Sequence, residues 1–183
     1  MPRTFTCDAI VLRAYDVGDA DRYCVLFTRE RGRLAARARG ARKLQSRLGG
    51  SLLSHQQLRV SLHEGKTGFL VTGAVGSTVD TKQSGAVDTF LRREQISELL
   101  LKLLHDEQPL PDVFELTVRF LNDEQSTVKQ YTEMLLQHLG LLPKERGSMT
   151  PNEWRRTCRD ILAEHASGAW KAATVAHSIM QEK

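Results

Sequence analysis

The period of the hydrophobic pattern changes once along this chain, near Gly85, and that change limits the folds it can adopt. Before Gly85, apolar side chains recur at every second residue, as they do on one face of a β-strand. After it, they recur at intervals of three and four residues, as they do on one face of a helix. The sequence therefore predicts an α+β protein, with a strand domain in residues 1–80 and an all-α helical bundle in residues 81–183.

Five short segments in the first domain are predicted strands, because they alternate or are rich in β-branched and aromatic residues. They cover residues 5–15, 22–28, 32–39, 57–63 and 69–76. Turn signals such as DVGDAD and EGKTG separate them. We expect a small five-stranded barrel, since closure leaves no exposed strand edge; an open half-sandwich is the alternative.

Helices are predicted in the second domain wherever apolar residues follow helical spacing. They cover about 86–105, 113–121, 128–139, 150–167 and 169–181. The third and fourth begin at the capping signals TVKQ and TPNE. In each, the Thr side chain accepts a hydrogen bond from the backbone N–H three residues later, and the Gln or Glu at that later position accepts one from the backbone N–H of the Thr. The segment QPLPD separates the first helix from the second.

Positive charge is concentrated in residues 28–50, TRERGRLAARARGARKLQSRLGG, where eight Arg and Lys residues accompany a single acidic residue, Glu30. Residues 1–80 hold 13 Lys+Arg and 7 Asp+Glu, a net of +6, whereas residues 81–183 hold 13 and 15, a net of −2. A row of like charges repels itself unless a polyanion neutralises it. The first domain is therefore expected to bind nucleic acid.

The order of the residues strengthens this expectation. Alternation along residues 32–39 places three arginines on one strand face: Arg33, Arg37 and Arg39. On such a face, each step of two residues spans about 7 Å. Arginine suits bidentate phosphate contacts and stacking on bases. Tyr15 and Tyr23 would stack on bases if they are exposed, whereas Phe27 is expected to be buried in the barrel.

Two alternatives stay open from the residues alone. Three acidic residues in one turn, Asp16, Asp19 and Asp21, allow a Mg²⁺-dependent nuclease, although Asp is common in turns. The basic row could instead bind an acidic protein, which would make the chain an adaptor. The segment EGKTG lacks the first glycine of a phosphate-binding loop, since that position is Val60.

Other classes of function receive no support. The three cysteines are far apart and form no CxxC pair, so neither a zinc site nor a disulfide framework is expected. Nothing in the chain requires catalysis. No apolar run is long enough to cross a membrane, and the N-terminus lacks the features of a signal peptide, so we expect a cytoplasmic protein.

A family resemblance accompanies these patterns. The run AIVLRAYDVGDADRYCVLFTRERGRLAARARGARKLQSRLGGSL, residues 9–52, closely resembles the N-terminal domain of the RecO family of bacterial DNA repair proteins. The features that match, in order, are IVLR, GDADR, LFTRERGRL, ARGAR and SRLGG. The segments ISELLLKLL and KQYTEMLLQHLG resemble two helices of the family's second domain, so the resemblance covers roughly residues 1–142.

The resemblance implies an OB-fold barrel followed by a helical domain, in a recombination mediator without enzymatic activity or a cofactor. Members of this family bind single- and double-stranded DNA and anneal complementary strands. With RecR they help RecA replace single-stranded DNA-binding protein (SSB), whose acidic C-terminal tail they also bind. Such work implies a cytoplasmic protein associated with the nucleoid.

The resemblance also assigns residues. The DNA-binding candidates are Arg13, Arg33, Arg37, Arg39, Arg42, Lys43 and Arg47. Lys129 is the candidate contact for the SSB tail. Many relatives hold zinc in a cysteine cluster that this chain lacks, so no metal is expected. The chain is also shorter than most relatives, and the difference falls after Leu142.

Overall fold

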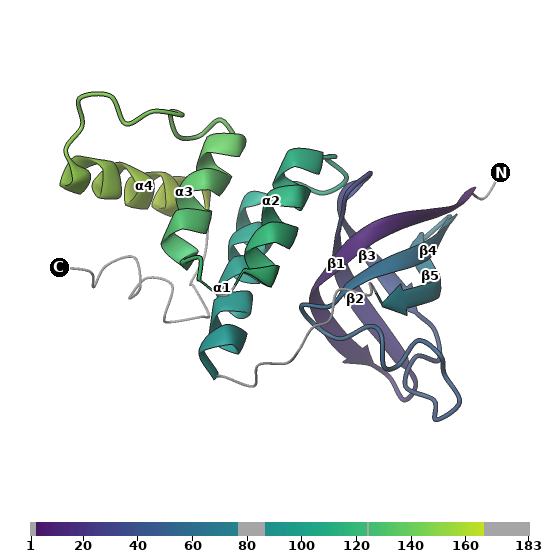
Figure 1. Ribbon diagram of the computed structural model, residues 1–183. Coiled ribbons are helices and arrows are strands. Elements are labelled where there is room, and N and C mark those ends of the chain that lie inside the picture. The colour runs from purple at the N-terminus through teal and green to yellow at the C-terminus, as the bar shows by residue number, and fades with distance from the viewer. Residues whose placement is uncertain (1–2, 77–86, 124, 167–183) are drawn as a thin grey trace. The chain divides into compact units, whose positions relative to one another are not determined.

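A computed structural model describes residues 3–76, 87–123 and 125–166. Its first part is a closed barrel of five strands in the order β1-β2-β3-β5-β4, which Figure 1 shows in purple and blue. The strands are β1 (Arg3–Val17), β2 (Asp21–Thr28), β3 (Gly32–Ala38), β4 (Gln57–Gly65) and β5 (Gly68–Gly76). All neighbours are antiparallel except β3 and β5, which are parallel. This is the predicted five-stranded OB-fold, and the half-sandwich alternative is excluded.

Small and aliphatic side chains fill the barrel. On β3 the even-numbered residues point inward, and Leu34, Ala36 and Ala38 are all buried in the core. Leu52, from the long connection between β3 and β4, is also fully buried in this core. The arginines between the inward residues of β3 therefore lie on the outer surface, as the alternation predicts.

A β-bulge in β1 reverses the facing of its second half. Val11 pairs with Leu26 on β2, and Arg13 pairs with the next residue, Val25. Leu12 has no partner on β2 and is therefore an extra residue in β1. Before the bulge the odd-numbered residues point into the core, and after it the even-numbered Ala14 does. The bulge therefore turns the odd-numbered residues of the second half outward.

The chain divides into two compact units, and the barrel unit includes the segment Leu104–Phe114 as well as Met1–Lys82. This segment, which falls within the predicted helical domain of residues 81–183, packs on the outside of the barrel. Phe114 meets Phe27 edge to face, with ring centroids 5.5 Å apart. Phe27 is completely buried by such contacts on the outer side of β2, outside the core cluster of the barrel.

The second unit is helical. It is built from α1 (Val87–Leu103), most of α2 (Pro111–Asn122), α3 (Val128–His138) and α4 (Pro151–His165). Tyr131 on α3 is fully buried, its hydroxyl lies 2.9 Å from the Thr117 hydroxyl, and its ring meets Phe120. Within the described residues, no helix is both long and apolar enough to cross a membrane.

The helix predictions agree closely with the structure. Both capping boxes are present, with Thr127 and Gln130 at the start of α3 and with Thr150 and Glu153 at the start of α4. The predicted helix at 169–181 lies outside the described residues. One strand prediction needs correction: β3 ends at Ala38, so Arg39 lies in the turn that follows and not on the strand face.

Candidate nucleic-acid interface

The outer face of β1, β2 and β3 carries aromatic and basic side chains in register. Tyr15 pairs with Tyr23 across β1 and β2, and Tyr23 pairs with Arg37 across β2 and β3. We call these three residues the cross-strand row. Tyr15 is 47% exposed, Tyr23 is 40% exposed, and the Arg37 side chain is 50% exposed. One step along the strands, half-buried Arg13 faces Val25 on the same surface.

Arg37 is held in place by Asp21. Its Nε–H donates to Asp21 Oδ2 over 2.8 Å, and its Nη2 lies 2.7 Å from the same oxygen. The backbone N–H of Gly40 donates to the other oxygen, and these bonds lower the pKa of Asp21, with the Gly40 bond as the larger cause. A guanidinium has five N–H donors, so donors of Arg37 remain for a phosphate.

Arg33 has a different environment at the far end of β3. Its Nε–H donates to Asp106 Oδ1 over 2.6 Å, and its carbonyl accepts from the N–H of Glu107 over 2.8 Å. Only 19% of the Arg33 side chain is exposed. Arg33 thus fastens the Leu104–Phe114 segment to β3 through both its side chain and its backbone.

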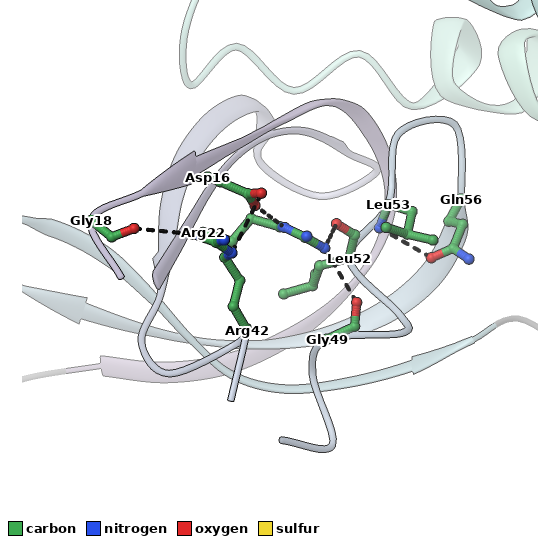
Figure 2. A network of polar contacts seen from close by, with 8 residues as sticks. All are labelled: Asp16, Gly18, Arg22, Arg42, Gly49, Leu52, Leu53 and Gln56. Carbon is green, nitrogen blue, oxygen red and sulfur yellow. Dashed lines mark hydrogen bonds and ion pairs between the residues drawn. The ribbon is translucent and has the colours of Figure 1, made fainter. Parts of the chain in front are cut away.

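The connection from β3 to β4, residues 39–56, forms a basic loop whose base is tied to the barrel (Figure 2). Arg22 donates from Nη1 to the carbonyls of Gly49 (3.2 Å) and Leu52 (3.1 Å), and from Nε to Asp16 (3.0 Å). Arg42 donates to the carbonyl of Gly18 over 3.0 Å, which ties the loop to the β1–β2 turn. A mostly buried arginine therefore fixes the loop.

The outer part of the basic loop carries its charges in solvent. Its exposed cations are Arg39, Arg42, Lys43 and Arg47. Leu44, between two of them, is completely exposed. The loop leaves β3 at the end of the barrel where Asp21 begins β2, so these cations follow Arg37 around one end of the barrel.

Two of the three aspartates at the β1–β2 connection, Asp16 and Asp21, neutralise arginines. Asp16 accepts from Arg22 and lies 3.4 Å from Arg42, and Asp21 accepts from Arg37. Among the described residues, no group of three or more His, Cys, Asp and Glu side chains is arranged to hold a metal ion. These ion pairs favour a structural role for the aspartates over the nuclease alternative.

Cysteine chemistry is also disfavoured. Cys7, Cys24 and Cys158 are free and buried. Burial raises the pKa of Cys24 and of Cys158 to about 11, so a reactive thiolate does not form at neutral pH.

A second basic site lies in the helical unit, where a groove of about 680 Å³ runs beside Lys129. The first turns of α3 and α4 line it with Gln130 and Pro151, and the mostly buried Trp154 also borders it. Three more cations line it: Lys144, Arg146 and Arg155. Because helix N-termini carry partial positive charge, two such ends and four cations, set against the single lining carboxylate of Glu133, make a groove suited to an anion.

The structure brings most of the predicted basic residues to one region and separates others. Arg13 and Arg37 share the outer face of the barrel, and Arg39, Arg42, Lys43 and Arg47 continue from it. Arg33 is occupied by Asp106, and Lys129 lies in the other unit. The alignment of Tyr15, Tyr23 and Arg37 in one row was not predicted, because it depends on the strand register and on the bulge in β1.

Comparison with known proteins agrees with this architecture. The family described as "Recombination protein O N terminal" matches residues 1–80, which contain the five strands. The curated protein named DNA repair protein RecO from Myxococcus xanthus is 34% identical over 153 residues, which are 75% of this chain and 59% of that protein. Its namesake from Heliobacterium modesticaldum is 41% identical over 106 residues, 57% of this chain and 38% of that protein.

A third relative, DNA repair protein RecO from Bacillus velezensis, is 36% identical over 122 residues, which are 64% of this chain and 47% of that protein. The chain thus spans between about two fifths and three fifths of these relatives. The family match at residues 1–80 covers all five strands of the barrel. By residues 1–80 the chain carries the N-terminal domain of the RecO family, and these relatives bear the RecO name.

Proposed function

We propose that this chain is a non-enzymatic DNA repair and recombination mediator that binds single- and double-stranded DNA through the outer face of its barrel. The observation that carries the proposal is the continuity of exposed cations from Arg37 on β3 into the basic loop. Arg22 holds the loop backbone at Gly49 and Leu52, so less backbone entropy is lost when DNA binds.

Six of the seven basic residues assigned from the sequence form the proposed phosphate-binding set: Arg13, Arg37, Arg39, Arg42, Lys43 and Arg47. Arg33 is left out of this set because Asp106 and the Leu104–Phe114 segment occupy it. Each phosphate neutralised on a single strand contributes about −0.7 to the slope of log K against log salt concentration. Four to six contacts give a slope of roughly −3 to −4.

Annealing follows from the same electrostatics. Two complementary strands repel each other, and cations that neutralise both lower the cost of bringing them together. In this proposal the protein works in the cytoplasm, at the nucleoid. It cooperates with RecR and thereby helps RecA replace SSB on a single strand, without a metal or nucleotide.

The groove beside Lys129 is the proposed site for the acidic C-terminal tail of SSB. Four cations and two helix N-termini favour the carboxylates of such a peptide. Lys129→Gln should weaken binding of an acidic peptide about tenfold. Arg156→Gln is the matched control, because Arg156 is exposed on α4 and does not line the groove.

A salt titration tests the proposal as a whole. Fluorescence anisotropy with a labelled oligothymidine and, separately, with the acidic peptide gives the affinity for each ligand over a range of salt concentrations. The proposal predicts salt-dependent binding of the oligonucleotide with the slope given above. Binding of the peptide without binding of the oligonucleotide would instead support the adaptor alternative.

A further inference from the structure

The cross-strand row, Tyr15, Tyr23 and Arg37, has a feature that phosphate binding does not explain. Two tyrosines lie directly opposite each other on neighbouring strands, and both are at least 40% exposed. Phe27 and Tyr131 in this chain are completely buried and Phe90 is exposed, but on the described strands Tyr15 and Tyr23 are exposed directly opposite each other. An exposed aromatic pair therefore marks a surface on which a ligand can pack.

The bulge at Leu12 places Tyr15 in this pair. If β1 continued its alternation from Val11 without interruption, Tyr15 would point into the barrel with Cys7 and Ala9. The extra residue turns it outward opposite Tyr23. Bulges commonly redirect side chains next to functional sites, and here the redirected side chain completes an aromatic pair.

Arg37 adds a charge to the same row. Neighbouring strands are about 4.8 Å apart, so the three side chains lie side by side across roughly 10 Å of surface. Asp21, two residues before Tyr23 on β2, binds the Arg37 guanidinium while half of the Arg37 side chain stays exposed. The row thus offers aromatic faces and a cation together, the combination with which barrels of this kind bind single strands.

We infer that Tyr15 and Tyr23 form a stacking platform for unpaired nucleobases, with Arg37 contacting the adjacent phosphate. This inference rests on the proposed function and deepens it, because it assigns a preference for single strands to particular residues. A base within a duplex is already stacked on both faces, so the platform favours single strands over duplexes. Stacking tolerates any base, and the site therefore selects for unpaired bases without selecting for sequence.

The test compares an oligothymidine with an abasic oligonucleotide of the same length, which keeps the phosphates but lacks the bases. Each is titrated with the full chain and with Tyr15→Ala, Tyr23→Ala and the double variant. We expect each single substitution to weaken binding of the oligothymidine by about tenfold. The slope with salt and the affinity for the abasic oligonucleotide should stay unchanged, because no phosphate contact is removed.

Tyr15→Phe and Tyr23→Phe are the matched controls, because they keep the aromatic face, and they should bind like the original chain. Thermal unfolding should show that the alanine variants keep the fold, as both positions are exposed. Unchanged affinity of the alanine variants for oligothymidine, or an equal loss for the abasic oligonucleotide, overturns the inference and leaves the proposed function standing. A complete lack of salt-dependent binding by the original chain overturns both.

Discussion

The guanidinium of Arg33 lies 2.6 Å from the carboxylate of Asp106, 73 residues further along the chain. This pair and the backbone bond from Glu107 to the Arg33 carbonyl fasten the Leu104–Phe114 segment to the outside of β3. Arg31 joins the same attachment, since it lies 3.7 Å from Glu107 and packs over the ring of Phe5. Two of the arginines in the basic run are therefore used within the fold.

Arg33→Gln should consequently affect stability more than DNA binding. We expect the free energy of unfolding to fall by about 0.5–1 kcal/mol, as for a partly exposed ion pair, and the amide of Glu107 to exchange its hydrogen faster. Chemical denaturation and hydrogen exchange measure these effects. Arg37→Gln is the matched comparison, and it should weaken oligonucleotide binding more than Arg33→Gln does; the reverse order would contradict this division of roles.

Gly32 is predicted to be essential for the same attachment. Its φ of +71° is in the left-handed region, and a Cβ at this position would overlap the carbonyl of Gln108. Gly32→Ala should therefore destabilise the barrel unit by about 2 kcal/mol or more, measured by thermal or chemical unfolding. Gly18→Ala provides the control: its φ is +57° with nothing within 4 Å, so only the conformational cost of about 1 kcal/mol applies.

The pH dependence of stability should report on Asp21. Hydrogen bonds from Gly40 and Arg37 lower the pKa of this carboxyl, so it binds a proton less readily in the folded chain than in the unfolded one. Its stabilising contribution is present above the ordinary aspartate pKa of about 3.9 and is lost as the pH falls through the lower folded value.

Asp21→Asn should accordingly lower the unfolding midpoint at neutral pH, and the difference from the original chain should shrink in acid. Unfolding curves recorded over that pH range measure both quantities. Asp19→Asn removes the same charge from the exposed turn just before β2 and should change the neutral midpoint little. A constant difference at every pH would show that the Asp21 contacts do not depend on its ionisation.

Much of the barrel could be predicted because each strand carries its own signal. Alternation located the inward face of β3, and the capping boxes located the starts of α3 and α4. Attachment of the Leu104–Phe114 segment could not be predicted, since its sequence, with two prolines, resembles a simple helix break. The place of this segment depends on Gly32, which leaves room for Gln108, and on the contacts of Arg33 with Asp106 and Glu107, which form only in the folded barrel.

The candidate site was predicted in composition more than in geometry. The arginines of β3 do face outward, but Arg33 is paired internally and Arg39 lies beyond the strand. The facing of Tyr15 depends on the bulge at Leu12, where the sequence carries no glycine or other evident signal. The domain bounds of 1–80 and 81–183 stay a prediction.

The most direct test of the central claim is the affinity of Arg37→Glu combined with Arg39→Glu for a labelled single strand at low and at moderate salt. We predict a loss of about 100-fold at low salt and a salt slope shallower by about 1.4, because two phosphate contacts are removed. Arg156→Glu combined with Arg159→Glu makes the same change in net charge on α4 and should bind almost normally. Unchanged DNA affinity in a folded Arg37→Glu, Arg39→Glu variant would contradict the account.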